Sequence, residues 1–150
     1  MSLYEMIKEM PMFEKFSEKE KKAFAKMEHT LCEFRQGDII IKDGEPRTSV
    51  YLLVKGAVLI SKNVNNAPIR LAKLRPGDIF GEMSFFSNRT RQSNVIANED
   101  VLAIRIDEKF FKNAKPAIKD KINCYFIKVL VNRLDAMNDS IMTISKLVRS

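Results

Sequence analysis

Residues that bind metals or form cross-links are scarce in this sequence, which has one histidine and two cysteines among its 150 residues. A histidine-rich metal site, a zinc finger and a disulfide scaffold all need more of them. We expect Cys32 and Cys124 to be free thiols of a cytoplasmic protein, because disulfides rarely persist in a reducing compartment. The N-terminal segment carries acidic residues and no long apolar run, and no window approaches the roughly 18 apolar residues of a membrane span. The sequence therefore predicts neither a signal peptide nor a membrane helix.

Basic residues outnumber acidic ones by 26 to 19, which gives a formal net charge of +7. This excess suits an anionic partner such as nucleic acid, a nucleotide or a membrane surface. It is uneven, because residues 101–150 hold ten basic and five acidic residues, whereas residues 36–100 hold nine and seven. The composition is 45% hydrophobic and 30% charged, typical of a soluble globular protein, and the length fits one domain.

Helical patterns are found at both ends of the chain. Residues 1–30 are predicted to be helical with an interruption at Pro11, and Ser17 with Glu20 forms an S-x-x-E capping box that opens a new helix. After residue 107 the pattern is helical again. Pro116 suits the first turn of a long helix that runs almost to Ser150.

Between Leu31 and Ile106 the pattern changes to short β-branched and aromatic runs separated by turns. Asn65-Asn66 is predicted to be a hairpin tip, because asparagine tolerates a positive φ. Pro76-Gly77-Asp78 is predicted to be a turn. Many short strands at this spacing predict a β-barrel or jelly roll with flanking helices.

The long C-terminal helix carries a narrow apolar seam with alternating steps of three and four residues. Its members are Ile127, Leu130, Leu134, Met137, Ile141, Ile144 and Val148. This spacing is the a/d pattern of a coiled coil and favours self-association as a homodimer. The alternative is a helix packed on its own barrel, which would show a broader stripe.

Two segments of the sequence resemble a known binding motif. Residues 76–86, PGDIFGEMSFF, and residues 91–97, RQSNVIA, resemble the phosphate-binding cassette of cyclic nucleotide-binding domains. That family includes the bacterial catabolite activator and the regulatory subunits of protein kinase A. The resemblance covers nearly the whole chain, and the five glycines fall at the family's glycine positions, namely Gly37, Gly44, Gly56, Gly77 and Gly81.

This resemblance implies a mainly β fold in a single cyclic nucleotide-binding domain over residues 1–150. N-terminal helices would span residues 1–30. An eight-stranded jelly-roll β-barrel would span residues 31–106 and contain a phosphate-binding cassette at residues 80–97. Helices would occupy residues 107–150.

The residues of the cassette suit a cyclic phosphate, which is small and carries one negative charge. Backbone N–H groups at a helix start, together with one guanidinium, would bind such an anion. Gly81 lets the backbone approach the ligand closely, and Glu82 is expected to open a short helix from Met83 to Phe86. By resemblance, Glu82 accepts a hydrogen bond from the ribose 2′-hydroxyl, and Arg91 pairs with the phosphate oxygens.

The remaining contacts are also implied by the resemblance. The purine would lie against apolar side chains that we expect in the barrel core, and the long helix would close over it. The complete predicted ligand set is Gly81, Glu82, Met83, Ser84, Arg91, Gln92, Ser93, Ile60, Leu71, Leu74, Arg133, Met137 and Asn138.

Gln92 departs from the family pattern, which has serine, threonine or alanine after the arginine. The lack of threonine argues against cGMP and favours cAMP, but the larger glutamine also leaves open a degenerate pocket. The sequence therefore leaves two hypotheses about function open. One is a regulatory module that couples cAMP binding to repositioning of its C-terminal dimerisation helix, with a downstream protein as a further candidate partner. The other is a ligand-free dimerisation module of the same fold.

Other function classes are not expected from this sequence. A helix-turn-helix domain that reads DNA would be expected after the long helix, which runs almost to Ser150 at the end of the given sequence. A cupin-like metal site on a similar barrel would need several histidines. No nucleophile–base arrangement is evident, so neither an enzyme nor a bound cofactor is predicted.

Overall fold

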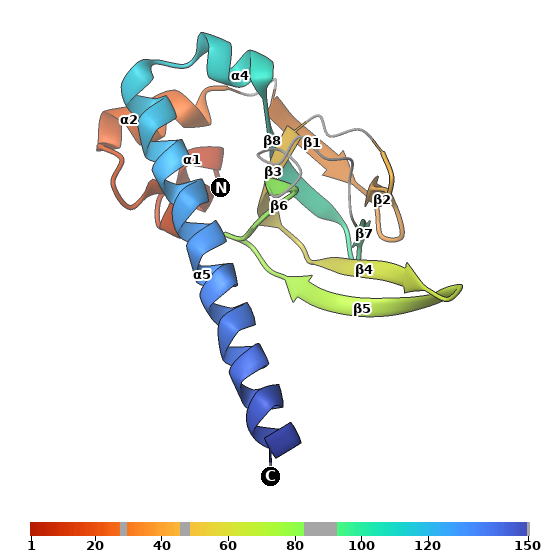
Figure 1. The fold of residues 1–150 in the computed structure, drawn as a ribbon. Helices are drawn as coiled ribbons and strands as arrows, with labels where there is room; N and C mark the ends of the chain where they lie inside the picture. Colours follow the sequence, from red (N-terminus) through yellow and green to blue (C-terminus); the bar gives the residue numbers. More distant parts are fainter. Residues whose placement is uncertain (28–29, 46–48, 83–92, 150) are drawn as a thin grey trace. The chain divides into compact units, whose positions relative to one another are not determined.

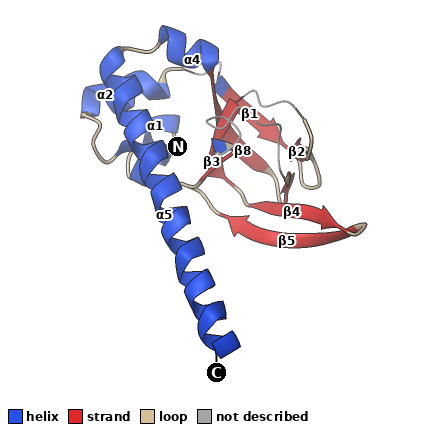
Figure 2. Ribbon diagram, in the orientation of Figure 1, coloured by secondary structure: helices blue, strands red, loops and turns tan. Residues whose placement is uncertain are grey.

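The computed structural model describes residues 1–27, 30–45, 49–82 and 93–149. The chain divides into two compact units, Met1–Ala114 and Lys115–Ser150. In the first unit the helices gather on one side and the strands on the other (Figure 2).

The first unit holds two antiparallel four-stranded sheets (Figure 1). The strand order of one sheet is β1 (Leu31–Phe34), β8 (Val101–Asp107), β3 (Ser49–Lys55) and β6 (Ile79–Phe80). The order of the other is β2 (Ile39–Ile41), β7 (Asn94–Ala97), β4 (Val58–Val64) and β5 (Ala67–Leu74). These eight strands, counted over the described residues, confirm the predicted jelly roll.

The core of this unit is built from β-branched, aliphatic and aromatic side chains of both sheets. Strand β3 is buried from Ser49 to Val54, as expected for a run of apolar residues in a central strand. Tyr51 stacks on Phe80 with ring centroids 5.1 Å apart and an interplanar angle of 11°. This contact anchors the short strand β6 to β3, which matters because the predicted cassette begins at the end of β6.

The N-terminal segment forms three short helical pieces, α1 (Leu3–Ile7), a 3-10 segment (Pro11–Phe13) and α2 (Glu18–Ala25). The predicted capping box is confirmed: the Glu20 N–H donates to Ser17 Oγ at 3.1 Å, and the Ser17 N–H donates to Glu20 Oε1 at 2.8 Å. After β8, helix α4 (Glu108–Asn113) begins at the N-cap Asp107. These helices share an aromatic cluster of edge-to-face rings, namely Phe13, Phe16, Phe24 and Phe110.

The hairpin of β4 and β5 extends beyond the other strands of its sheet (Figure 1). Its tip is Asn65-Asn66, with φ of 52° and 64°, which confirms the predicted turn. The register shifts within the hairpin, because Ile60 lies opposite Ala72 whereas Ser61 lies opposite Arg70. Leu71 is therefore the extra residue of a β-bulge, which leaves it without a cross-strand partner in the register.

The second unit contains helix α5 (Pro116–Arg149), which confirms the predicted long helix. Its buried residues are Ile118, Ile122 and Phe126, and burial ends where the predicted seam begins. Both cysteines are free thiols. Within the ranges that the structure describes, no helix is both long and apolar enough to cross a membrane.

Candidate functional site

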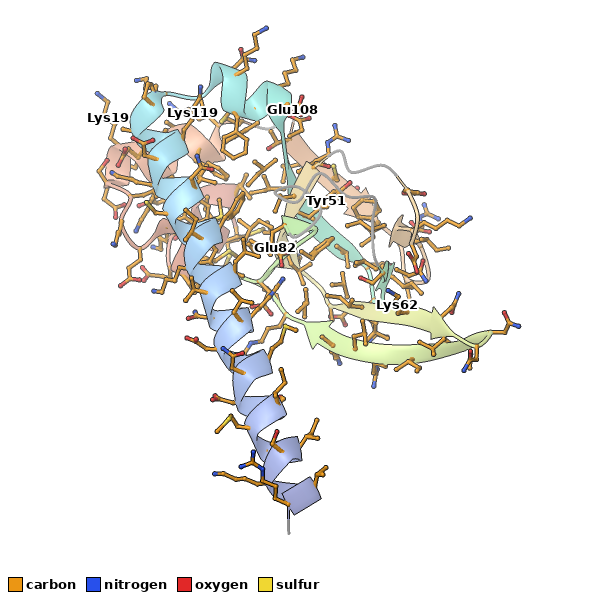
Figure 3. The ribbon with its side chains drawn as sticks, in the orientation of Figure 1. Lys19, Tyr51, Lys62, Glu82, Glu108 and Lys119 are labelled. Atoms are coloured by element: carbon orange, nitrogen blue, oxygen red, sulfur yellow. The ribbon has the colours of Figure 1, made fainter. Side chains whose placement is uncertain are left out.

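Strand β6 leads into the predicted cassette. Gly81 comes directly after Phe80 and has a φ of +85°, a conformation that glycine adopts without the steric cost of a Cβ. Glu82 comes next, and its side chain is only 1% exposed. Figure 3 labels Glu82 beside the end of β6. The sequence therefore turns sharply at Gly81 and places a carboxylate inside the protein immediately afterwards.

The burial of Glu82 is unusual for a carboxylate. Among the described residues, Glu82 is the one buried residue with a charged side chain. The other buried polar residues are Thr30 and Ser49. Glutamate is almost never fully buried without hydrogen-bond or ionic partners, because removing a charge from water costs several kcal/mol. A carboxylate in this environment can accept a hydrogen bond without competition from bulk water, which suits recognition of a hydroxyl.

The predicted cassette ends at strand β7, which belongs to the other sheet. Ser93 lies just before β7, which pairs with β4 so that Val95 is opposite Ile60. The next residue, Asn94, accepts a hydrogen bond at its Oδ1 from the Asp43 N–H at 2.9 Å. Because β6 and β7 belong to different sheets, the cassette connects the two layers of the sandwich. Met83, Ser84, Arg91 and Gln92 lie outside the described residues, so their roles stay predictions.

Two of the three predicted purine contacts share one surface. Ile60 and Leu74 lie on the same face of the β4–β5 hairpin and pack, half-buried, against the core cluster that contains Val58 and Phe80. Leu71 does not fit the expectation of a core residue, because it is 57% exposed. The alternation along β5 accounts for the difference, because Ala72 and Leu74 are half-buried whereas Leu71 and Lys73 are exposed. Leu71 therefore lies on the outer face of the strand.

Three predicted contacts lie on α5, in the second unit. Arg133 is half-buried, whereas Met137 and Asn138 are exposed, Met137 by 58%. The structure gives no position of these residues relative to Glu82. Their closure over a ligand stays a prediction.

The predicted seam of α5 is largely exposed. Six of its seven members are exposed by 56–80%, and Leu130 is half-buried. Three further apolar residues outside the seam, Val131, Met142 and Leu147, are exposed by 48–70%. These three were not predicted from the sequence, although their hydrophobicity at e, b and g positions of the heptad was visible. The exposed apolar surface of α5 is therefore broader than the predicted seam.

A separate groove of about 540 Å³ was not predicted from the sequence. It is lined by Glu33, Phe34, Arg35, Asp38, Lys55, Asp100, Val101 and Leu102. Two of its carboxylates accept hydrogen bonds from the backbone of the turn at residues 35–38: Asp38 Oδ2 from the Arg35 N–H at 2.8 Å, and Asp100 Oδ1 from the Gln36 N–H at 2.9 Å. No group of three histidine, cysteine or acidic residues suitable for a metal ion occurs in the part of the chain that the structure covers. None of the predicted ligand residues lines this groove.

The chain is similar in sequence and in structure to several known proteins. The chain is 33% identical over 81 residues to human cGMP-dependent protein kinase 2, and the match covers 52% of the chain and 11% of the kinase. The chain thus corresponds to a small part of that relative. A cyclic nucleotide-binding domain from Methylobacillus flagellatus superimposes with a TM-score of 0.76 at 19% identity, covering 93% of this chain and 80% of that structure.

A structural match of higher sequence identity comes from the EAL enzyme Bd1971 in its cAMP-bound form. Its TM-score is 0.53 at 26% identity, with 80% of this chain and 32% of that one covered. The family described as "Cyclic nucleotide-binding domain" matches residues 31–115, which is more than half of the chain. Those residues contain both sheets, the turn at Gly81 and the buried Glu82, and the chain belongs to the family of cyclic nucleotide-binding domains.

Proposed function

We propose that this domain binds a cyclic nucleotide, cAMP in preference to cGMP, at the cassette between β6 and β7. The observation that carries this proposal is the buried carboxylate of Glu82 directly after the positive-φ residue Gly81. A neutral hydroxyl is a suitable donor to such a group, and the ribose 2′-hydroxyl of a cyclic nucleotide supplies one. Arg91 provides the guanidinium for the cyclic phosphate, as a charge-assisted pair.

Two structures of Bd1971 support the choice of ligand. They are described as its cAMP-bound and cGMP-bound forms, at 26% and 29% identity to this chain. The choice between the two nucleotides rests on Gln92, which stands where a threonine hydroxyl could bind guanine. We therefore expect cAMP to bind more tightly than cGMP.

We further propose that the ligand repositions α5. Ala114 and Lys115 separate α4 from α5, and Ala114 has extended backbone angles, φ −75° and ψ 150°. The boundary between the two compact units falls at this link, which supports a hinge there. A ligand can move the helix only if it contacts α5 differently in two states. Arg133, Met137 and Asn138 are the residues proposed to make that contact, and the exposed seam is proposed to form a homodimer.

Titration calorimetry with cAMP, cGMP and 5′-AMP tests the binding proposal. We expect saturable heat with cAMP, weaker binding of cGMP and none of 5′-AMP, which lacks the cyclic phosphate. Absence of heat with both cyclic nucleotides would contradict the proposal. It would favour the second candidate function, a ligand-free dimerisation module, for which the exposed seam of α5 is the supporting observation.

The repositioning of α5 needs its own measurement. Cys124 is exposed on α5 and can carry a spin label, with Cys32 replaced by serine and a second label at Asn63→Cys on β4. We expect the distance distribution between the labels to shift when cAMP is added. An unchanged distribution at saturating cAMP would contradict the coupling and leave the binding proposal intact.

A further inference from the structure

Two turns in the barrel have the same sequence pattern and the same internal hydrogen bonds. Both read Arg-x-Gly-Asp, at residues 35–38 and 75–78. The Asp38 N–H donates to the Arg35 carbonyl at 2.9 Å and Asp38 Oδ2 accepts from the Arg35 N–H at 2.8 Å. The Asp78 N–H donates to the Arg75 carbonyl at 3.1 Å and Asp78 Oδ2 accepts from the Arg75 N–H at 3.1 Å.

The two turns are also attached to their neighbouring strands in the same way. The Gly37 N–H donates to the Ala97 carbonyl at 2.8 Å, and the Ala97 N–H donates to the Asp38 carbonyl at 2.9 Å. In the second turn, the Gly77 N–H donates to the Leu53 carbonyl at 2.8 Å, and the Leu53 N–H donates to the Asp78 carbonyl at 2.9 Å. The turns are structural equivalents, so one can serve as the control for the other.

The two turns lead into different segments of the chain. The Asp38 turn leads into β2 and then to Lys42, which is exposed. The Asp78 turn leads into β6, a strand of two residues at the edge of its sheet, and then to Gly81 and the buried Glu82. Only three residues separate Asp78 from the proposed ribose-binding residue in the sequence.

The surroundings of the turns differ as well. A Cβ built on Gly77 would lie 3.7 Å from Pro11 Cδ and 3.9 Å from Met10 Cγ, so the N-terminal 3-10 segment covers this turn. A Cβ on Gly37 would have no atom of the described residues within 4 Å apart from its chain neighbours. The Asp78 turn is therefore held between β3 and the N-terminal segment.

We propose that Asp78 is a positioning residue for Glu82. This inference rests on the proposed function, because it assigns to Glu82 the reading of the ribose 2′-hydroxyl. Strand β6 is fixed by its pairing with Tyr51 and Leu52 and by the turn before it. The Asp78 carboxylate closes that turn and sets where β6 begins. In so short a strand, a displaced start moves the Glu82 carboxylate directly, since a slip of one residue shifts the chain by about 3.3 Å and reverses the side-chain direction.

The test compares Asp78→Ala with Asp38→Ala, in the full chain. The dissociation constants of cAMP and 2′-deoxy-cAMP are measured for each, together with the thermal unfolding midpoint. Both variants lose one turn-closing hydrogen bond, and the unfolding midpoint reports how far each one is destabilised. We expect Asp78→Ala to weaken cAMP binding by about three- to tenfold, the value of one hydrogen bond, and to leave 2′-deoxy-cAMP unchanged. Asp38→Ala should bind both nucleotides as the wild type does.

Two further variants make the test specific. Asp78→Asn keeps a side-chain oxygen that can accept from the Arg75 N–H, so it should retain the wild-type ratio of the two constants. Asp78→Glu keeps the charge on a longer side chain and should reduce the ratio, which provides a second reading if Asp78→Ala does not fold.

The outcomes are distinguishable. An unchanged ratio in Asp78→Ala and Asp78→Glu, or an equal loss in Asp38→Ala, would overturn this inference while the wild type still binds cAMP. A wild type that binds cAMP and its 2′-deoxy analogue equally would also overturn it. A wild type that binds neither nucleotide would overturn the proposed function as well.

Discussion

Gly56 lies directly against the backbone of Asp100. A Cβ at Gly56 would be 2.3 Å from the Asp100 carbonyl oxygen and 3.1 Å from the Val101 Cα. This contact joins the turn after β3 to the turn before β8. The strands β3 and β8 themselves pair in one sheet. The φ of +93° at Gly56 adds a second reason for glycine at this position.

We predict that Gly56→Ala strongly destabilises the fold. A Cβ at this position must displace the backbone of residues 100–101 and also adopt the left-handed region. The expected loss is about 2–5 kcal/mol in the free energy of unfolding, the combined cost of overpacking and of a positive φ. Gly37→Ala is the matched control, with a φ of +91° and open space around the Cβ, and should lose only about 1–2 kcal/mol. Urea denaturation measures both, and equal losses would refute the close approach.

Arg91→Ala should abolish most of the cAMP affinity. A charge-assisted hydrogen bond to phosphate is worth about 1.5–3 kcal/mol, so the dissociation constant should rise by at least about tenfold. Arg89→Ala removes the same charge two residues earlier, at a position between the two motif segments 76–86 and 91–97, and should change the constant by less than about twofold. Calorimetry on both variants checks the assignment. An Arg91→Ala variant that binds as well as wild type would refute it.

Glu82→Gln should reduce the preference for ribose over deoxyribose. Glutamine is almost isosteric with glutamate and keeps an acceptor oxygen but carries no charge, so the hydrogen bond from the 2′-hydroxyl is weakened. We expect the affinity for cAMP to fall toward that for 2′-deoxy-cAMP, with little change for the deoxy analogue. Competition against a fluorescent cyclic nucleotide measures all four constants. Retained discrimination would place the ribose contact elsewhere.

Ile141→Lys should dissociate the proposed homodimer. Ile141 is a seam position and is 57% exposed, while its neighbour Met142 is 59% exposed but lies off the seam. A lysine at an a position of a coiled coil puts a charge in the apolar interface, whereas a lysine at Met142 would face solvent. Sedimentation equilibrium should give a monomer for Ile141→Lys and a dimer for both Met142→Lys and the wild type. A monomeric wild type, or equal dimerisation of both variants, would contradict the seam assignment.

Several elements of the fold were predictable because their signals are local. The capping box of Ser17 and Glu20, the hairpin tip at Asn65-Asn66 and the helix that starts at Pro116 each depend on a few adjacent residues. Strand β6 was not predicted, since a two-residue strand has no periodicity and forms only because Tyr51 and Leu52 lie beside it. The β-bulge at Leu71 was missed for a related reason, because register depends on both strands.

The candidate site was predictable only in part. Glu82 and Gly81 were predicted from the cassette motif, and the structure adds the depth of burial of Glu82, which no local pattern specifies. The equivalence of Asp38 and Asp78 was present in the sequence as two Arg-x-Gly-Asp segments. That the two turns are attached to the sheets in the same way depends on hydrogen bonds to Ala97 and Leu53, which are distant in the sequence from the turns.

The proposed site uses little of the net charge of the chain. The excess of basic residues is concentrated in residues 101–150. The proposed pocket needs one guanidinium, that of Arg91, and one buried carboxylate, that of Glu82.

The most direct test of the proposed site is a crystal structure of the chain grown with cAMP. We predict cAMP between β6 and β7, with its ribose 2′-hydroxyl oxygen about 2.5–3.0 Å from a Glu82 carboxylate oxygen, the range of an O–H···O hydrogen bond. The phosphate should face the Arg91 guanidinium. Density for cAMP in the groove beside Phe34 and Lys55, with Glu82 away from the ligand, would contradict the proposed site.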